Sequence, residues 1–282
     1  MPSVTAIVAT RDRPEMAAEA VRSILAQTRP PEEIIVADDG DGRTAAALAA
    51  RYGVQTTQSW KRGPAAARNA AASLAGGDWL AFCDDDDTWL PTRLEKQLAV
   101  ADADTVLVFA DADRSDGRRE SAGRKPAAGS VFRRLLLDNW IPTSTVLLRR
   151  DAFERAGGFH PRFSPAEDYD LWLRVSRLGQ VRFFAEPLAT YRIHAGQLQN
   201  QQLEMIGATV ATVENAWREG RREYHRPAGL SGRLRRLHFL HGRLLAHHGF
   251  PAAARRAYLR AWRYAWFYPP APLFWLLSFI GI

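Results

Sequence analysis

Four consecutive carboxylates end an apolar run in the segment WLAFCDDDDTWLP, residues 79–91. Each member of the run from Asp84 to Asp87 raises the cost of ionising its neighbours, so the run is unfavourable unless something offsets the repulsion. A divalent cation would do so, because hard ions prefer oxygen ligands and keep positions open for substrate phosphates. The simplest alternative is a solvated acidic turn, in which Asp87 only caps a helix beginning near Pro91.

The spacing Asp84-x-Asp86-x-Thr88 also matches the nucleophile motif of haloacid-dehalogenase-type phosphatases. Those proteins usually carry the motif on their first strand, whereas here it follows the fourth predicted strand. The cation interpretation is therefore favoured over a phosphatase.

The elements that would position these carboxylates alternate between strand and helix over the first hundred residues. The β-branched run at the start is typical of a strand buried on both faces, and Pro64 suits the first turn of a helix. The predicted strands are Val4–Thr10, Glu33–Asp39, Val54–Gln58 and Asp78–Cys83, with helices at Arg13–Gln27, Thr44–Tyr52 and Pro64–Leu74. This order predicts an α/β fold with a mainly parallel sheet flanked by helices.

Polar residues follow three of these strands, at Thr10–Arg13, Asp38-Asp39 and Asp84–Asp87. In open α/β sheets, ligands bind beyond the carboxyl ends of the strands. Two acidic strand ends together with a threonine and arginines therefore predict a rim that binds a charged ligand.

The pattern is less regular further along the chain. Predicted strands are Thr105–Ala110, Thr143–Arg149 and Val181–Phe184, with helices at Ser130–Asn139 and Asp168–Leu178 and helical periodicity from Gln197 to about Tyr268. The loop Asp111–Gly129 and the segment around Trp140 are expected to form the remaining ligand pockets, although neither carries an identifying motif.

Composition places the chain among globular proteins, with 46% hydrophobic and 24% charged residues. The single cysteine, Cys83, excludes an intrachain disulfide, fits a reducing compartment and is expected to pack in the core. The N-terminal residues lack the features of a secretory signal, and no apolar run is long enough to span a bilayer. We therefore expect a cytoplasmic protein.

The C-terminal part is strongly basic. From Trp217 to Arg263 there are twelve arginines and two acidic residues, Glu219 and Glu223, whereas the whole chain carries a net charge of only +7. The pattern predicts two amphipathic helices broken at Gly249-Phe250-Pro251, in which arginine alternates with aromatic and aliphatic residues. Such helices suit an anionic membrane surface. Packing of these helices on the domain and homodimerisation are the alternatives. Nucleic-acid binding is not expected, because the sequence shows no recognition motif and the rest of the chain is acidic.

Three segments together resemble family 2 nucleotide-sugar glycosyltransferases with the A-type fold, which is Rossmann-like. They are VTAIVATRDRPEMAAEAVRSILAQTRPPEEIIVADDGDG, GPAAARNAAASLAGGDWLAFCDDDDTWLP and AGGFHPRFSPAEDYDLWLRVSRLGQVRFFAEPLATYRIHAGQ, within residues 3–197. The resemblance implies a metal-dependent, inverting transfer of a sugar from a nucleoside diphosphate, UDP or dTDP, to a hydroxyl of a glycan or lipid-linked acceptor. A sugar-phosphate nucleotidyltransferase and a non-catalytic sugar-nucleotide-binding module are the remaining alternatives.

The resemblance also implies roles for individual residues on the donor side. One carboxylate of the Asp38-Asp39 pair would accept a hydrogen bond from a uracil-type base, and Asp84 would reach the ribose. The other implied nucleotide-binding residues are Thr10, Arg13, Arg62, Arg68 and Asp85. For Arg62 and Arg68 a structural salt bridge is an equal alternative. Mn²⁺ or Mg²⁺ would be bound by Asp86 with Asp84 and His194.

On the acceptor side, Glu167-Asp168 resembles the family's acidic motif, whose aspartate is the general base. An inverting transfer needs such a carboxylate to take the proton of the attacking hydroxyl. The alternative makes Asp168 only the N-cap of its helix.

The predicted organisation is a catalytic domain at 1–197 and a helical, Arg- and aromatic-rich extension at 198–282. The catalytic domain divides into a nucleotide-binding half, about 1–110, and an acceptor half, about 111–197. An enzyme with a lipid-linked acceptor would lie on the inner face of the plasma membrane.

Overall fold

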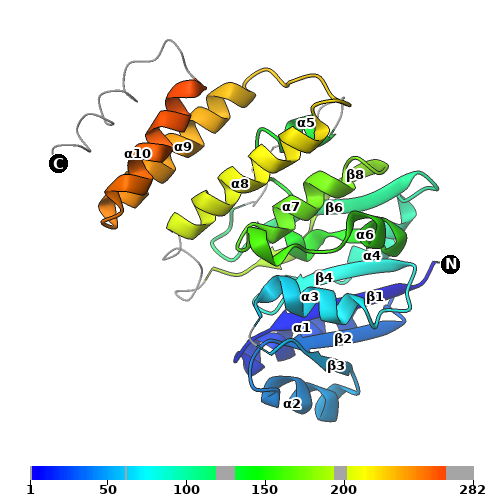
Figure 1. The fold of residues 1–282 in the computed structure, drawn as a ribbon. Helices are drawn as coiled ribbons and strands as arrows, with labels where there is room; N and C mark the ends of the chain where they lie inside the picture. Colours follow the sequence, from blue (N-terminus) through cyan, green and yellow to red (C-terminus); the bar gives the residue numbers. More distant parts are fainter. Residues whose placement is uncertain (1, 61, 119–130, 194–201, 265–282) are drawn as a thin grey trace.

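The computed structural model describes residues 2–60, 62–118, 131–193 and 202–264, and its centre is one eight-stranded sheet (Figure 1). The strand order is β3-β2-β1-β4-β7-β6-β8-β5. The strands are β1 (Val4–Thr10), β2 (Glu33–Asp38), β3 (Gln55–Gln58), β4 (Trp79–Asp84), β5 (Thr88–Trp89), β6 (Thr105–Arg114), β7 (Leu147–Arg149) and β8 (Gln180–Tyr191).

Helices cover both faces of this sheet. Seven precede the C-terminal part: α1 (Pro14–Leu25), α2 (Arg43–Tyr52), α3 (Pro64–Ala72), α4 (Arg93–Ala99), α5 (Val131–Leu135), α6 (Arg150–Ala156) and α7 (Glu167–Val175). Two 3₁₀ turns, Thr143–Thr145 and Pro161–Phe163, complete this part. Three longer helices follow: α8 (Gln202–Gly220), α9 (Leu230–His247) and α10 (Pro251–Arg263).

Strand alternation divides the core between the two faces of the sheet. Ile7, Phe82 and Phe109 point to the face covered by α3, α6 and α7. Their neighbours Val8, Cys83 and Val108 belong to the cluster under α1, α2 and α4. Cys83 is buried there, as its place in the strand predicts.

The first half of the sheet follows the predicted alternation of strand and helix. β1 pairs in parallel with β2 and with β4, and β2 pairs in parallel with β3. The mainly parallel α/β fold is confirmed for this half.

The second half departs from the sequence-based expectation. β7 is antiparallel to both β4 and β6, and β5, which was not predicted, is antiparallel to β8. The strand expected at Val181–Phe184 extends to Tyr191, because its pairing with β6 continues across bulges that the apolar pattern does not mark. The strand expected at Thr143–Arg149 begins with a 3₁₀ turn, and the expected Ser130–Asn139 helix is the short α5. Of the expected loop Asp111–Gly129, the first four residues belong to β6 and residues 119–130 lie outside the described ranges.

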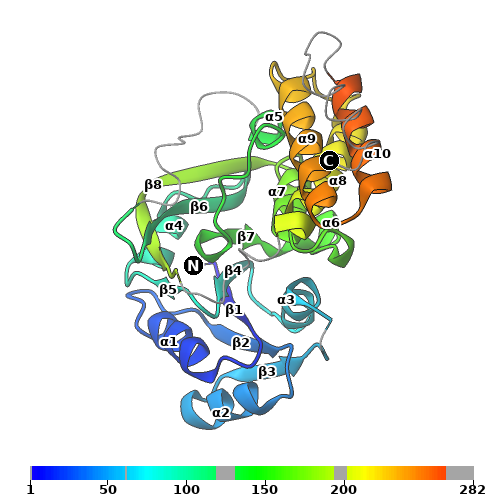
Figure 2. The ribbon, with the colours of Figure 1, turned by 90° about the vertical axis from the view of Figure 1, so that its left-hand side faces the viewer.

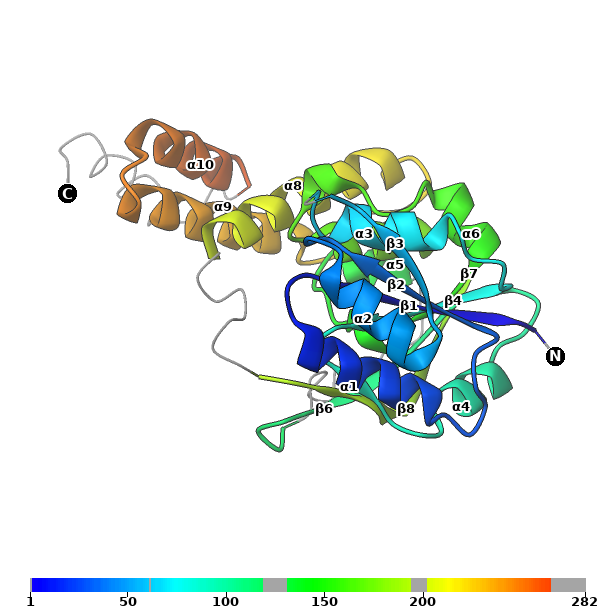
Figure 3. The same ribbon diagram turned by 90° about the horizontal axis from the view of Figure 1, so that it is seen from below.

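The C-terminal helices join the body through α8. Val213 and Ala216 of α8 and Leu230 and Leu234 of α9 belong to the same buried cluster as the sheet. α9 and α10 form an antiparallel hairpin that projects away from the sheet, at the end opposite β3 (Figures 1 and 3). The expected break between the two helices is confirmed, since α9 ends at His247 and α10 begins at Pro251.

A buried polar contact ties this hairpin to α8. His238 of α9 is 1% exposed, and its Nε2 lies 2.8 Å from Oε1 of Glu214 on α8. The Tyr264 hydroxyl donates to the same oxygen at 3.2 Å. None of the helices in the described part of the chain combines the length and the hydropathy of a membrane-spanning segment.

Candidate active site

A cavity of about 1120 Å³ opens where the carboxyl ends of β1, β2 and β4 meet the second half of the molecule. Figure 2 shows β1–β3 at one end of the molecule and α8–α10 at the other. The walls combine both halves: strand ends with Thr10, Asp39 and Asp84–Asp87, the segment Asp138–Thr143, the start of α7, and residues of α8 and α9.

Parallel register brings the three polar strand ends together. Thr10 lies opposite Asp38, and Ala9 lies opposite Asp84. The polar strand ends therefore share one edge of the sheet, as predicted, and Thr10, Arg13 and Asp39 line the cavity.

The four aspartates that follow β4, called here the strand-end cluster, have different partners. Asp84 pairs with Arg68 at 2.6 Å. Asp85 accepts a hydrogen bond from the Thr10 hydroxyl at 2.8 Å. Arg13 Nη1 lies 3.2 Å from Asp85 Oδ1 and 3.0 Å from Asp86 Oδ2. Two arginines thus offset the repulsion between three of the carboxylates.

Burial also affects the protonation of the strand-end cluster. Loss of solvent, together with the charge of Asp86, raises the pKa of Asp85 to about 6, although the hydrogen bond from Thr10 opposes the shift. The Asp85 carboxyl is therefore about half protonated near pH 6.

Asp87 does not cap a helix, contrary to the alternative raised from the sequence. The next helix, α4, begins at Arg93 with Thr92 as its N-cap. Asp87 is buried and accepts hydrogen bonds from the Ser144 hydroxyl at 2.5 Å and from the Arg192 N–H at 3.1 Å. Burial raises its pKa well above the usual range. It connects β4 to the 3₁₀ turn and to the end of β8.

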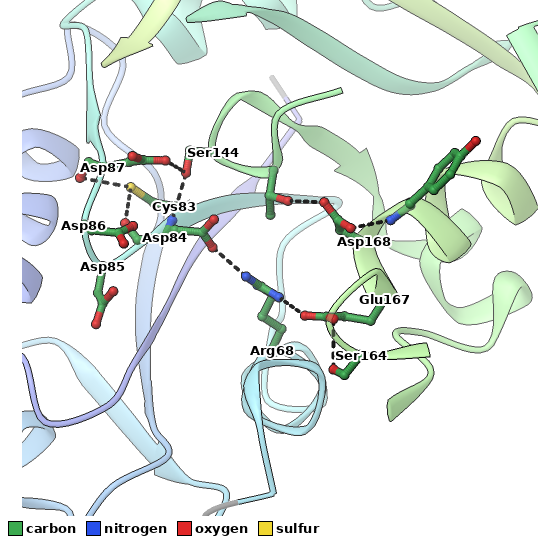
Figure 4. A network of polar contacts seen from close by, with 12 residues as sticks. Arg68, Cys83, Asp84, Asp85, Asp86, Asp87, Ser144, Ser164, Glu167 and Asp168 are labelled. Atoms are coloured by element: carbon green, nitrogen blue, oxygen red, sulfur yellow. Dashed lines mark hydrogen bonds and ion pairs between the residues drawn. The ribbon is translucent and has the colours of Figure 1, made fainter. Parts of the chain in front are cut away.

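Arg68 of α3 connects the strand-end cluster to the start of α7 (Figure 4). Its Nη2 contacts Asp84 at 2.6 Å and its Nη1 contacts Glu167 at 2.9 Å, with a side chain only 10% exposed. Burial opposes its charge, but the carboxylates of Asp84 and Glu167 raise the pKa of Arg68 above its ordinary value. This guanidinium stays charged between the two acidic groups.

Glu167 and Asp168, called here the helix pair, differ in their contacts and surroundings. Glu167 is buried and also accepts a hydrogen bond from the Ser164 hydroxyl at 2.9 Å. Asp168 lines the cavity and accepts hydrogen bonds from the Thr143 hydroxyl at 3.1 Å and the Tyr169 N–H at 2.6 Å. Burial and the neighbouring charge of Glu167 raise the pKa of Asp168 to about 7.

Asp168 is not the N-cap of its helix. The N-cap of α7 is Ala166, and Asp168 lies within the first turn. A carboxylate near a helix N-terminus is favoured by the helix dipole, yet its raised pKa shows that burial outweighs this effect.

The two carboxylates at the end of β2 face different ways. Both Asp38 oxygens accept backbone hydrogen bonds, from Gly40 at 2.7 Å and Ala45 at 3.1 Å, which orders the turn into α2. Asp39 lines the cavity and accepts hydrogen bonds from the Ser59 hydroxyl at 2.6 Å and the Gly63 N–H at 3.1 Å. Of the predicted pair, Asp39 is the one available to a ligand.

A divalent cation fits the chemistry of this wall. Asp84 and Asp86 both line the cavity and offer the hard oxygen donors that Mg²⁺ and Mn²⁺ prefer. Within the described ranges, no group of three or more His, Cys, Asp or Glu is arranged to hold a metal. Two carboxylates supplemented by diphosphate oxygens are a usual ligand set for Mg²⁺. His194 lies outside the described residues, and Arg62 is exposed.

Sequence reasoning missed the hydroxyls of Thr143 and Ser144, which contact Asp168 and Asp87. The run Pro-Thr-Ser-Thr at 142–145, with three hydroxyls inside an expected strand, was the available signal. Sequence reasoning also missed the contribution of the C-terminal helices to the cavity. Met205, Ile206 and Thr209 of α8 and Arg233 and Leu237 of α9 line it.

The sequence model of the family described as Glycosyl transferase family 2 matches residues 5–160, more than half of the chain. Together with the mixed α/β sheet and its acidic strand end, this shows that the chain belongs to the family 2 glycosyltransferases, and it is therefore an enzyme of the transferase class.

Curated relatives agree with this assignment. An uncharacterised glycosyltransferase of Rickettsia prowazekii is 27% identical over 219 residues, which cover 73% of this chain and 68% of that protein. The succinoglycan biosynthesis protein ExoO of Rhizobium meliloti is 34% identical over 115 residues, which cover 39% of this chain and 33% of that protein.

Solved structures share the fold. S. aureus TarS 1–349 in complex with UDP-GlcNAc has a TM-score of 0.66 at 15% identity and covers 92% of this chain and 81% of that one. A mannosyltransferase from Pyrobaculum calidifontis in complex with GDP-Man and Mn²⁺ has a TM-score of 0.63 at 17% identity and covers 99% and 85%. The predicted A-type fold is confirmed.

Proposed function

We propose that this enzyme transfers a sugar, with inversion, from a nucleoside diphosphate to an acceptor hydroxyl, with Asp168 as the general base. The observation that carries the proposal is the division of charge in the cavity. Arg68 pairs with Asp84 and Glu167. Among the described residues, the hydrogen-bond partners of Asp168 are the Thr143 hydroxyl and the Tyr169 N–H, and its pKa is about 7. A base with a pKa near the operating pH is the most effective.

In the transfer step the acceptor oxygen forms a bond to the anomeric carbon as the bond from that carbon to the diphosphate oxygen breaks. The acceptor proton passes to a carboxylate oxygen of Asp168, and the bonding pair leaves with the nucleoside diphosphate. Thr143 and the Tyr169 N–H hold Asp168 in place. Arg68 and Arg13 lie where positive charge can face the diphosphate.

Asp84 and Asp86 would hold Mg²⁺ or Mn²⁺, which supplies charge that stabilises the departing diphosphate. The Mn²⁺ named with the Pyrobaculum mannosyltransferase supports a divalent ion here. Thr10, Asp39 and Asp85 would contact the nucleotide, as the resemblance implies. An Asp84 nucleophile of the phosphatase type is disfavoured, because Asp84 ends β4, the fourth strand along the chain, and is paired with Arg68.

The donor sugar is tested by a hydrolysis screen over UDP-, dTDP- and GDP-sugars with Mn²⁺. Both UDP-GlcNAc and GDP-Man occur in structures with this fold, so the screen covers both base classes. We expect release of the nucleoside diphosphate from one class and its loss with EDTA. Absence of release from every donor, with and without acceptor glycans, would contradict the proposal.

For the acceptor we propose a glycan or lipid-linked saccharide, reached from an anionic membrane surface. α9 contributes Arg233 and Leu237 to the cavity wall. Further along the same helix, Leu240 is exposed to solvent. From Leu230 to Tyr264 the chain has eight arginines and no acidic residue. Phe250, Leu259 and Trp262 are exposed on the same hairpin, a combination that favours the membrane interface. The relationship to ExoO supports a role in polysaccharide biosynthesis.

The membrane proposal is tested by flotation with anionic and neutral vesicles. Arg256, Arg260 and Arg263 are exposed on α10, and each arginine near an anionic leaflet contributes about 1 kcal/mol. Changing all three to Gln should therefore weaken binding to anionic vesicles by about a hundredfold. A matched control changes the exposed Arg22, Arg43 and Arg51 of α1 and α2 to Gln, which should leave binding unchanged. An intact protein that ignores both vesicle types would make the hairpin a packing or dimerisation element.

A further inference from the structure

Two strained residues flank the end of β2. Among the described residues, Asp12 and Trp60 are the non-glycine positions with positive φ, at 54° and 58°. Such conformations are unfavourable for residues other than glycine and cluster at ligand sites. Asp12 approaches Gly40 so closely that a Cβ there would lie 2.4 Å from Asp12 Oδ1. Trp60 directly follows Ser59, which bonds to Asp39. Both strained positions therefore lie beside the same strand end.

The loop that carries Trp60 is held by Asp39. Ser59 donates its hydroxyl to Asp39 Oδ1 at 2.6 Å, and the Gly63 N–H lies 3.1 Å from both carboxylate oxygens. The next residue, Pro64, lines the cavity. Ser59 and Gly63, which stand on either side of Trp60 in the sequence, are thus both held by a carboxylate in the cavity wall.

Trp60 itself faces solvent. Its side chain is 71% exposed, more than any other large apolar side chain in the described ranges; Phe250 follows at 53%. An indole in water on a strained backbone adds nothing to the core. Its position is explained if the exposed ring contacts a ligand.

We propose that Trp60 is a stacking platform for the nucleobase of the donor, beside Asp39, to which the family resemblance already gives the edge of that base. The inference rests on the proposed use of a nucleoside-diphosphate donor. A nucleobase has a flat face for the indole and a polar edge for a carboxylate, and stacking on an aromatic side chain contributes about 1–3 kcal/mol. An ionised carboxylate has about four acceptor positions. Ser59 and Gly63 use Oδ1 twice and Oδ2 once. Arg11 Nη1 lies 4.0 Å from Oδ2, beyond hydrogen-bond distance, so Oδ2 can still accept an N–H.

This arrangement selects among bases. Uracil, thymine and guanine carry a ring N–H that can donate to Asp39, whereas cytosine and adenine present a ring nitrogen that only accepts. A second acceptor placed against the carboxylate is unfavourable. Only the exocyclic amino group of cytosine or adenine could donate to Asp39, and the base would have to shift to present it. UDP, dTDP or GDP should therefore bind more tightly than CDP and ADP.

The test is calorimetry in the presence of Mn²⁺ with two ligands: whichever of UDP, dTDP and GDP the wild-type enzyme binds most tightly, and ribose 5-diphosphate, which lacks a base. Trp60→Ala should weaken nucleotide binding by about 5- to 150-fold, the range equivalent to the stacking energy, and leave ribose 5-diphosphate binding unchanged. Trp60→Phe should retain most of the affinity. Trp262→Ala removes a 50% exposed tryptophan from α10 and should change neither ligand.

Two outcomes would overturn the inference: unchanged nucleotide affinity in Trp60→Ala, or an equal loss for both ligands, which would indicate a structural role for the loop. A wild-type enzyme that binds none of the three nucleotides would instead contradict the proposed function. If only the stacking role of Trp60 is wrong, the wild-type enzyme still binds its nucleotide and hydrolyses the donor.

Discussion

The strand-end cluster and the helix pair both place carboxylates side by side in one cavity, but their surroundings differ. In the strand-end cluster, Arg13 and Arg68 pair with three of the four aspartates. In the helix pair, the same Arg68 contacts Glu167 alone. Asp168 makes no ion pair within the described part of the chain, and its pKa rises to about 7. The position of one guanidinium therefore distinguishes the two carboxylates of the pair: Glu167 has a charged partner, and within the described residues Asp168 has none.

The difference between the two groups follows from how neighbouring charges and burial affect the protonation of a carboxylate. A neighbouring cation favours the charged form of a carboxylate, which suits metal binding, whereas desolvation and a neighbouring carboxylate favour the protonated form. Asp85, which is paired with Arg13 but also buried, lies between these cases, with a pKa of about 6. The two groups can share a cavity because Arg68 separates them, with 2.6 Å to Asp84 and 2.9 Å to Glu167 (Figure 4).

The largest effect is expected for Asp168→Asn. The change is nearly isosteric and removes the proton acceptor, so kcat should fall by about 10²- to 10⁴-fold, the usual contribution of a general base. Donor affinity measured by calorimetry should stay within a few-fold. Asp151→Asn, an exposed position on α6, serves as the matched control and should keep full turnover. If Asp168→Asn keeps turnover within a few-fold of wild type, the base lies elsewhere and the contrast between the two groups has no catalytic meaning.

A smaller effect, on binding, is expected for Asp86→Asn. Loss of one charged ligand should weaken Mn²⁺-dependent nucleotide binding at least about tenfold, equivalent to ~1.4 kcal/mol. Calorimetry with UDP or GDP should show little further loss when EDTA is added to this variant. Asp41→Asn, an exposed carboxylate after β2, should behave as wild type. Equal nucleotide affinity with and without metal in the wild-type enzyme would remove the metal role from the strand-end cluster.

The smallest effect is expected for the pH profile. Asp168 must be ionised to accept a proton, so wild-type kcat should be half-maximal near pH 7, approach its maximum about one pH unit higher and fall as the pH drops. Thr143→Val removes a hydrogen bond that stabilises the carboxylate, which raises the pKa of Asp168. A hydrogen bond of about 0.5–1.5 kcal/mol corresponds to a shift of about 0.4–1.1 pH units upward.

Turnover measured between pH 5.5 and 9 gives the midpoint of each profile. At pH 8.5 and above, where Asp168 is ionised in both enzymes, the variant should approach the wild-type rate. An unchanged midpoint, or one displaced to lower pH, would show that Thr143 does not act through Asp168.

Much of the first half of the fold was predictable from local pattern. Strands such as Val4–Thr10 are short β-branched runs, and Pro64 and Gly53 mark where helices begin and end. The second half was less predictable, because β5 has two residues and β8 continues through bulges, neither of which leaves a periodic signal.

The sequence by itself determined that polar residues stand at the ends of β1, β2 and β4, which is the basis for predicting a charged ligand at this edge of the sheet. It also determined the family, because ordered motifs depend only on the order of residues. Tertiary structure decided the roles within each motif: Asp39 faces the cavity while Asp38 orders a turn, and Arg68 pairs with Glu167 rather than Asp168. It also brought α8 and α9, distant in sequence, to the wall beside Asp168. The physical reason is that a side chain's charge state and partners depend on groups brought near it from other elements, and local sequence carries no record of those distances.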